Sequence, residues 1–307
     1  MTTVRTVHWM SALALLLGWA TAHAQTPPAA PSAEQRRAET QAAYKAATQA
    51  SQRGPGDVKL IDQAMLKIPA GMMFVPPAEA GRLLRAVGNR TGDSLVGLLM
   101  PAGDRDWWIV VKYVKEGFVK DGDAKEWKAD DLLASLKEGT EESNKERAER
   151  GFPEIDIIGW IQPPQYDFAT HRLSWSLSSR NKGAPADADQ GVNYNTYALG
   201  RDGYFSLNLL TTVPELPKDK PVVQGLLTDL TYAPGKRYED FNESTDHIAE
   251  YGIAALVGVV AAKKLGLIAL GLAFFAKFAK LGVLAVVGAG AVIARFFKRK
   301  PKAGPAA

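Results

Sequence analysis

The sequence predicts an α+β domain, rich in antiparallel strands, followed by a C-terminal transmembrane or membrane-associated helical segment. Three observations lead to this class. The middle of the chain alternates short β-branched and aromatic stretches with turn residues, a pattern typical of antiparallel sheets. A few longer stretches between them have helical character. Both ends of the chain are apolar, and the last 56 residues contain nine basic residues and no acidic residue.

The N-terminus resembles a secretory signal peptide, which we assign to residues 1–24. Arg5 provides a positive charge, residues 10–20 form an apolar run, and residues 22–24 (Ala-His-Ala) form a small-x-small cleavage site. The apolar run is too short to cross a bilayer, which needs about 20 residues. We therefore expect export and cleavage between Ala24 and Gln25, with an uncleaved anchor as the alternative.

The exported part of the chain is expected to begin with a linker and a solvated helix at residues 25–56. The α+β domain is then expected to span residues 57–251. Its predicted strands are 58–61, 64–68, 72–75, 95–100, 107–114, 155–161, 172–177, 192–199 and 204–210. Its predicted helices are 78–87 and 129–149, residues 214–221 are predicted to be a loop, and a helix is predicted at 242–262.

Residues 252–297 consist of apolar runs separated by lysines and predict membrane-associated helices. A transmembrane span near 272–297 keeps the lysines close to one interface, and the positive-inside rule then places the basic tail, 298–307, in the cytoplasm. A two-span hairpin and a helix lying on the membrane surface are the alternatives. We expect a protein of the inner membrane with most of its chain in the periplasm. Membrane lipid is then a partner, and the glycines of this segment would permit homo-oligomers.

Composition excludes several classes of function. The chain contains no cysteine, so disulfides, thiol catalysis and thiolate metal sites are excluded. Signal cleavage would leave only His171 and His247, so we expect no metal site and no cofactor. Setting aside the nine C-terminal basic residues and Arg5 leaves 27 basic against 33 acidic residues, a net charge near −6. An acidic body with a basic tail favours a membrane location and argues against nucleic-acid binding.

The densest group of aromatic and polar residues lies at 159–175. We expect Pro163 and Pro164 to form a turn between two strands, so that Trp160 and Trp175 face each other across a hairpin. Paired indoles are more often part of a core than of a binding platform. The structural aromatic candidates are Trp107, Trp160 and Trp175.

Five polar residues are the binding candidates. They are Tyr166, Asp167, His171, Arg201 and Asp121. Four of them also have a structural interpretation: Asp167 as the cap of a turn, His171 as a hydrogen-bonded residue, Arg201 in a salt bridge beside a turn and Asp121 in a turn.

Three classes of function are compatible with these residues. The first is an interaction, binding or structural module at the inner membrane, which contacts another envelope protein or cell-wall material. The second is a periplasmic hydrolase that uses carboxylates such as Asp121, Asp123 or Asp167, and this class requires a cleft with at least two acids distant in sequence. The third is an oligomerising protein that remodels the membrane. The sequence contains no Walker loop, HExxH or GxSxG motif, so no catalytic residue can be assigned.

Six short phrases identify a family resemblance. They are GFVKD at 117–121, GWxxPPxYD at 159–167, HRLSW at 171–175, VNY at 192–194, LGRxG at 199–203 and GxRYxDF at 235–241. In this order, over residues 56–262, they resemble the domain of unknown function 2167 family of membrane-anchored bacterial envelope proteins. The resemblance implies a Gram-negative origin, export and a C-terminal anchor. It implies no activity and assigns no catalytic residue.

Overall fold

The computed structural model describes residues 32–257 of the chain. The expected signal peptide with its Ala24–Gln25 cleavage site, the expected span near 272–297 and the tail 298–307 lie outside these residues. Among the helices of residues 32–257, none has both the length and the apolar character needed to cross a bilayer.

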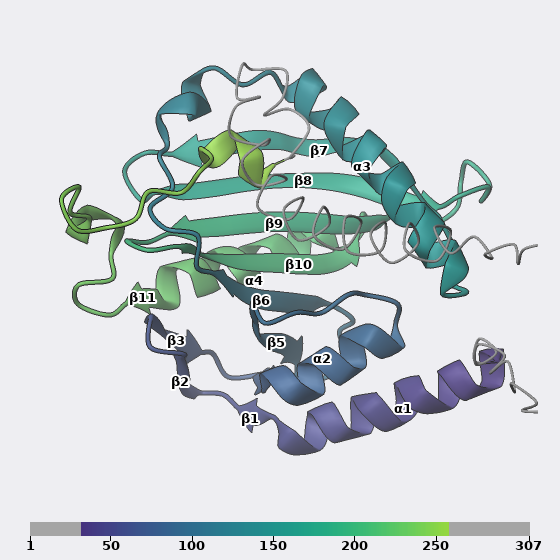
Figure 1. Ribbon diagram of the computed structural model, residues 1–307. Coiled ribbons are helices and arrows are strands. Elements are labelled where there is room, and N and C mark those ends of the chain that lie inside the picture. The colour runs from purple at the N-terminus through teal and green to yellow at the C-terminus, as the bar shows by residue number, and fades with distance from the viewer. Residues whose placement is uncertain (1–31, 258–307) are drawn as a thin grey trace, which may run out of the picture. The chain divides into compact units, whose positions relative to one another are not determined.

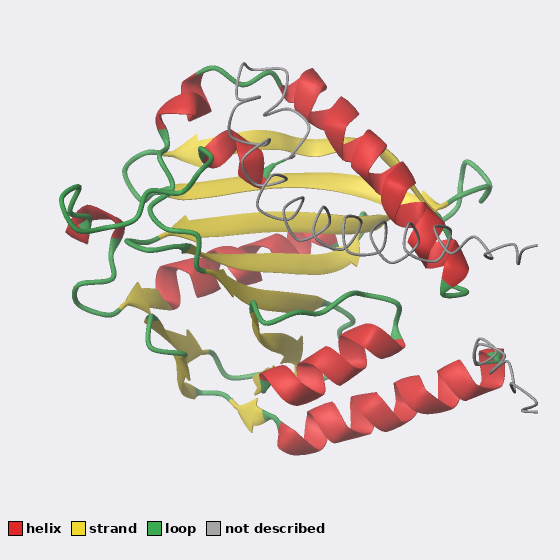
Figure 2. Ribbon diagram, viewed as in Figure 1, coloured by secondary structure: helices red, strands yellow, loops and turns green. Residues whose placement is uncertain are grey.

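Two antiparallel sheets organise the described residues (Figure 2). The main sheet has eight strands in the order β1-β4-β5-β6-β10-β9-β8-β7, and the second sheet has three in the order β11-β3-β2. The strands are β1 Gln52–Arg53, β2 Gly56–Leu60, β3 Ala64–Ile68, β4 Met72–Val75, β5 Leu95–Pro101, β6 Trp108–Val114, β7 Ile155–Asp167, β8 Arg172–Asn181, β9 Gly191–Leu199, β10 Tyr204–Thr212 and β11 Leu230–Tyr232. Neighbouring strands in both sheets pair antiparallel, so the predicted α+β class is confirmed for these residues.

Four α-helices flank the main sheet (Figure 1). They are α1 Ala33–Ala50, α2 Pro77–Ala86, α3 Ala129–Glu149 and α4 Leu216–Asp229, and three short 3-10 helices are η1 Gly122–Lys125, η2 Tyr238–Asp240 and η3 Ile253–Leu256. Helix α3 crosses the front of the sheet in Figure 1, whereas α4 lies behind it. Helix α1 packs on α2, and Ala43 and Ala47 are buried in that contact.

The two faces of the main sheet have different chemistry. The rear face is covered by α4 and the second sheet, and one continuous apolar cluster fills this interface, with Ile109, Val111, Leu207 and Leu209 from the central strands. On the front face, one apolar cluster lies under α1 and α2, and a separate one lies around α3 and η3. Between the two front clusters, the central strands β6, β10 and β9 present polar side chains.

The predicted turn at Pro163 and Pro164 is wrong. Both prolines lie within β7, and the chain turns only after Asp167. Strand β7 is the last strand of the sheet, and prolines are tolerated there because an edge strand has a free side that needs no N–H donors. Irregularities of the β7–β8 register accompany the prolines.

Two further expectations are corrected. The loop predicted at 214–221 is instead the start of α4, which tolerates Pro217 in its first turn and contains Pro221. The helix predicted at 242–262 is not formed over 242–252, which consists of turns, bends and one isolated bridge at Ile248; up to residue 257, where the described part ends, only the short η3 follows. Side chains of Asn242 and Asp246 bond to nearby backbone N–H groups in this stretch and thereby compete with helix formation.

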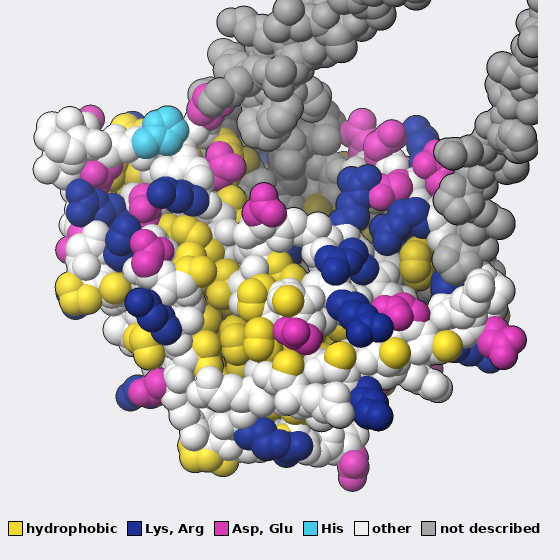
Figure 3. Space-filling view, turned by 60° about the horizontal axis from the view of Figure 1, so that its bottom comes forward, with side chains coloured by type: hydrophobic (Ala, Val, Ile, Leu, Met, Phe, Trp, Pro, Cys, Tyr) yellow, Lys and Arg dark blue, Asp and Glu magenta, His cyan; other side chains and the backbone are white. Residues whose placement is uncertain are grey.

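Exposed large hydrophobic side chains are dispersed over several elements. They are Tyr44, Ile61, Met65, Ile158, Ile161, Phe168 and Val213. Figure 3 shows the face that lies at the bottom of Figure 1, where hydrophobic side chains gather in the middle and charged side chains of both signs are interspersed around them. This mixture of charges is ordinary for a soluble protein surface.

Candidate functional site

The turn that joins β7 to β8 is fixed by Asp167. Its Oδ1 accepts a hydrogen bond from the backbone N–H of Ala169 at 2.9 Å, and its Oδ2 accepts one from the Thr170 hydroxyl at 2.7 Å. These bonds, first of all the one from Thr170, hold the pKa of Asp167 below its usual value. The Asp167 carboxylate is therefore engaged in local turn structure.

Three of the five binding candidates meet beside this turn. The Tyr166 hydroxyl donates to Oδ2 of Asp121 at 2.8 Å and lies 3.2 Å from Nδ1 of His171, which lies 3.4 Å from the same Asp121 oxygen. Burial and the hydrogen bond to Asp121 raise the pKa of Tyr166 well above its usual value. The tyrosine thus stays protonated and donates to Asp121, and its hydroxyl links Asp121 and His171 into one network.

A stack of aromatic rings extends this network to the segment before the C-terminal region. The His171 ring stacks on Tyr238 with centroids 4.0 Å apart, Tyr238 contacts Phe118 at 4.4 Å, and Phe118 stacks on Phe241 at 3.8 Å. The Tyr238 hydroxyl also donates to the backbone carbonyl of Val119 at 3.0 Å. The stack therefore holds together three segments that are distant in sequence, at residues 118–119, 171 and 238–241, and this gives its rings a structural role.

Arg201, the fourth candidate, forms a bidentate ion pair. Its Nε lies 2.7 Å from Oδ2 of Asp246, and a terminal guanidinium nitrogen lies 2.9 Å from Oδ1. The hydrogen bond from Arg201 holds the pKa of Asp246 far below its usual value. The guanidinium also donates to the Gly235 carbonyl, so its donors are largely used within the chain.

The three tryptophan candidates occupy different environments. Trp160 and Trp175 contact edge to face, with ring centroids 5.8 Å apart and planes at 80°. Trp175 is buried on β8, whereas Trp160 on β7 is half-buried and its indole N–H donates to the Ala129 carbonyl of α3 at 3.1 Å. Trp107 is buried in the rear apolar cluster, just before β6.

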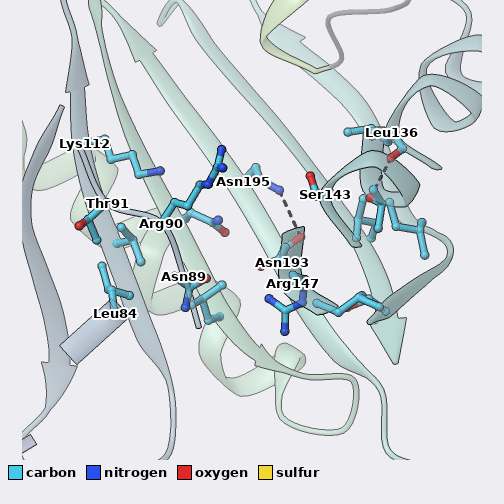
Figure 4. A pocket seen from close by; sticks show the side chains of 18 of the residues that line it. Leu84, Asn89, Arg90, Thr91, Lys112, Leu136, Ser143, Arg147, Asn193 and Asn195 are labelled. Atoms are coloured by element: carbon cyan, nitrogen blue, oxygen red, sulfur yellow. Dashed lines mark hydrogen bonds between the residues drawn. The ribbon is translucent and has the colours of Figure 1, made fainter. Parts of the chain in front are cut away.

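A cavity of about 390 Å³ lies on the front face of the sheet, between the loop that follows α2 and helix α3 (Figure 4). Its floor is formed by strands β6, β10, β9 and β8. Its polar lining residues are Asn89, Arg90, Thr91, Lys112, Thr140, Ser143, Asn144, Arg147, Ser179, Asn193, Asn195 and Asn208. The volume lies at the lower end of the range of small-molecule sites.

The register of the strands explains why polar groups gather on this floor. Directly paired residues share a face of the sheet, and one row runs from Val110 through Asn208 and Asn195 to Trp175. Lys112 follows Val110 on the same face of β6. The row therefore places two amides between an apolar residue at one end and an indole at the other.

Two polar atoms of this floor are buried and have no hydrogen-bond partner among the described residues: Oδ1 of Asn208 and Nε1 of Trp175. Asn195 is only 7% exposed, and its amide makes one long bond of 3.5 Å to the Asn193 carbonyl. Leaving a buried acceptor or donor unpaired costs about 1–3 kcal/mol. Proteins tolerate such a loss of stability mainly at functional sites, so unpartnered polar groups on the cavity floor favour a role in ligand binding.

The carboxylates proposed for hydrolysis do not meet in this cavity. Its lining, as far as the described residues form it, includes no Asp or Glu. Asp123 instead accepts from the backbone N–H groups of Ile253 and Ala254 at 3.1 and 3.2 Å, and burial raises its pKa. Within residues 32–257, no group of three or more His, Asp or Glu side chains is arranged to hold a metal ion.

Sequence reasoning missed the cavity. The available signal was the alternation in β9, where Val192 and Tyr194 are buried on the rear face while Asn193 and Asn195 point to the front. That alternation is also the pattern of any antiparallel strand with one polar face, so it does not by itself indicate a cavity. Only the register with β10 and β6 brings Asn208 and Lys112 beside these amides.

Comparison with solved structures finds distant similarities. The CyanoP protein (cyanobacterial PsbP) of Synechocystis sp. PCC 6803 is 11% identical with a TM-score of 0.36, over 60% of this chain and 93% of that chain. The Ran-binding protein Mog1p of Saccharomyces cerevisiae is 11% identical with a TM-score of 0.31, over 62% of this chain and all of that chain. Similarity at this level gives no indication of function.

No curated protein sequence matches the chain significantly. A protein family does match, over residues 52–288, which include both sheets, the Asp121 network and the cavity. The match covers well over half of the sequence. The chain therefore belongs to the family described as "Protein of unknown function (DUF2167)".

Proposed function

We propose that this protein is a membrane-anchored periplasmic binding protein that holds a small ligand in the cavity between the sheet and α3. The observation that supports the binding site is the pair of unpartnered polar atoms on the cavity floor, Asn208 Oδ1 and Trp175 Nε1. Both atoms are fully buried, so a ligand with matching groups would satisfy them by displacing the groups that cover them. The apolar walls, which include Leu84, Leu136 and Ile157, would bury the rest of it.

A double variant, Asn195→Leu with Asn208→Leu, tests the binding site. Leucine is close to asparagine in size, so the variant replaces the polar floor with an apolar one and leaves the backbone intact. If the floor serves binding, the melting temperature of the variant stays equal to or above that of the wild type, because Asn208 Oδ1 has no partner among the described residues and the Asn195 amide makes only one long hydrogen bond.

The readout is the set of small molecules that co-purify with the full chain, released by denaturation and identified by mass spectrometry. We expect the wild type to release a compound that the double variant lacks. A Ser244→Leu variant, altered in an exposed turn, serves as the control and should release the same compound as the wild type. Identical small-molecule profiles for all three proteins, or a large loss of stability in the double variant, would contradict a binding role for the cavity.

The cellular location is a separate part of the proposal and rests on the sequence. It is supported by the signal-like residues 1–24 and by the apolar, basic C-terminal segment. The mature protein should begin at Gln25 by mass spectrometry, and a phosphatase fused after Pro301 should be inactive because it remains in the cytoplasm. An intact Met1 in membrane fractions, or an active fusion, would contradict this topology.

A further inference from the structure

All charged residues that line the cavity within the described chain are positive. Arg90, Lys112 and Arg147 line it, and no acidic residue does so within the described chain. The surface in Figure 3, by contrast, mixes both signs, and the body of the chain has an excess of acidic residues. The cavity thus has the opposite charge to the rest of the body of the chain. A cleft lined by positive charge creates a local positive potential that attracts anions.

The three bases differ in their partners. Arg90 pairs with Glu146 at the rim, where the Arg90 side chain is 76% exposed. Arg147 donates from Nε to the Pro153 carbonyl at 2.8 Å. Lys112 has neither a hydrogen bond nor an ion pair among the described residues, although it is half-buried on the sheet face and its burial lowers the pKa of the ammonium.

Within residues 32–257, the surroundings of Lys112 provide no counter-ion for its charge. Directly paired with it are Ser206 on β10 and Leu95 on β5, neither of which can neutralise an ammonium. A partly desolvated cation without a counter-ion is unfavourable in the empty protein, and an anionic ligand removes that penalty. Figure 4 shows the Lys112 and Arg90 side chains on the same side of the cavity as Thr91, with Asn195 and Asn193 on the floor next to them.

Two further polar groups on the cavity floor indicate which hydrogen-bonding groups the ligand would carry besides its negative charge. Trp175 Nε1 can only donate, whereas the unpartnered Asn208 Oδ1 can only accept. Asn208 lies diagonally across from Lys112 on the adjacent strand, within reach of one small ligand. A ligand that satisfies all of these groups presents an acceptor, a negative charge and a donor such as a hydroxyl.

We propose that the cavity binds a small organic oxyanion that also has a hydroxyl or amino group, with Lys112 as its counter-ion and Asn208 as the acceptor for its donor group. This inference rests on the proposed binding function and adds the chemical class of the ligand. Two sources have this chemistry: a free phosphorylated polyol or hydroxy acid, and the headgroup of an anionic phospholipid. The volume of about 390 Å³ exceeds what a bare inorganic ion fills and leaves room for the organic part.

The test measures binding to the full chain by titration calorimetry, with glycerol phosphate, inorganic phosphate, sulfate and glycerol as probes at constant ionic strength. We expect glycerol phosphate to bind more tightly than any of the others. Lys112→Met should weaken its binding roughly tenfold or more, since it removes a bond to a charged group. Asn208→Leu should weaken binding of glycerol phosphate but leave that of sulfate, an oxyanion with no donor group, unchanged.

Lys59 on β2 provides a matched control, because it is exposed, lies on the second sheet and gives the same change of net charge when replaced by methionine. Lys59→Met should bind glycerol phosphate like the wild type. Equal affinity of Lys112→Met and wild type would overturn the oxyanion inference, as would equal affinity for glycerol and glycerol phosphate. If the Asn195/Asn208 double variant still loses a co-purifying neutral compound, the cavity remains a binding site and only its ligand class is wrong.

The source of the ligand is resolved by amine acylation of the wild type, read at Lys112 and Lys59 by peptide mass spectrometry. Glycerol phosphate should protect Lys112 and leave Lys59 reactive. Equal protection by phosphatidylglycerol vesicles, but not by phosphatidylcholine vesicles, identifies a lipid headgroup, whereas protection by glycerol phosphate alone identifies a free ligand. If no probe protects Lys112, the inference fails.

Discussion

Trp175→Ala is the perturbation that most directly measures how the apolar cluster around α3 is held together. Trp175 is 6% exposed, and its ring contacts that of Trp160 edge to face. It also forms one end of the cavity floor. Its removal leaves a void between β8 and α3 that the rigid strands cannot close.

The magnitude follows from the buried area. An indole buries about 200 Å², which at about 25 cal/mol per Å² corresponds to about 5 kcal/mol as an upper bound. Loss of the edge-to-face contact adds about 0.5–1.5 kcal/mol. Removal of the unpartnered indole N–H offsets about 1–3 kcal/mol of this. We expect Trp175→Ala to lower the free energy of unfolding by about 3–5 kcal/mol, as in other large-to-small core changes.

Urea unfolding of the full chain, followed by circular dichroism, measures this loss. Two matched variants separate its components. Trp175→Phe retains a ring and removes the N–H, so it should cost less than about 1.5 kcal/mol. Trp160→Ala, at a half-buried position, should cost about 2–3 kcal/mol, which includes its hydrogen bond to Ala129.

Unfolding of Trp175→Ala at the same urea concentration as the wild type would contradict a stabilising role for the buried ring. A greater loss of stability in Trp160→Ala than in Trp175→Ala would contradict an order set by burial. A loss in Trp175→Phe as large as in Trp175→Ala would mean that the indole N–H has a partner, which would contradict the open cavity floor.

Three further predictions concern the other sites. Tyr166→Phe should lower stability by about 1.5–3 kcal/mol in urea unfolding, because its hydroxyl donates to a carboxylate; an unchanged midpoint would show that the network is not formed. The hydrogen bond from Arg201 lowers the pKa of Asp246, so the ion pair stabilises the fold above about pH 4 and this stabilisation is lost as the pH falls further. The difference in unfolding free energy between wild type and Asp246→Asn should therefore shrink when the pH is lowered from about 7 to below 4. A difference that grows in acid would contradict this sign. Gly203→Ala should destabilise, because its Cβ would overlap a neighbouring backbone carbonyl, whereas Gly225→Ala, in open space on α4, should raise the melting temperature; the reverse order would contradict the packing at these positions.

Local signals were sufficient for most strands and for three helices, α1, α2 and α3. The strand at β6 was predictable because its β-branched and aromatic run has no competing helical period. Helix α3 was predictable from its length and spacing. Helix α4 was not, because Pro217 and Pro221 indicate a loop, yet Leu216, Val223, Leu226 and Leu227 form one stripe that is buried on the rear face. Tertiary burial outweighed the cost of the prolines.

The candidate site was predictable only in part. Asp121, Tyr166 and His171 were selected from sequence as polar residues near aromatics, and the structure brings them together. Their closure into a network depends on the position of Asp121, 45 residues before Tyr166 in the chain, which no local pattern specifies. The cavity depends on strand register in the same way, since a slip of one residue would turn Lys112 to the opposite face.

The two ends of the main sheet also determine how another molecule can approach this protein. One edge strand, β1, has only two residues, and the other, β7, has two adjacent prolines and an irregular register with β8. An incoming strand would find too short a template at one edge and missing donors at the other, although Ile158 and Ile161 are exposed on β7. Growth of the main sheet from chain to chain is thus disfavoured. A protein partner at this sheet is expected to bind through side chains and loops rather than by adding a strand.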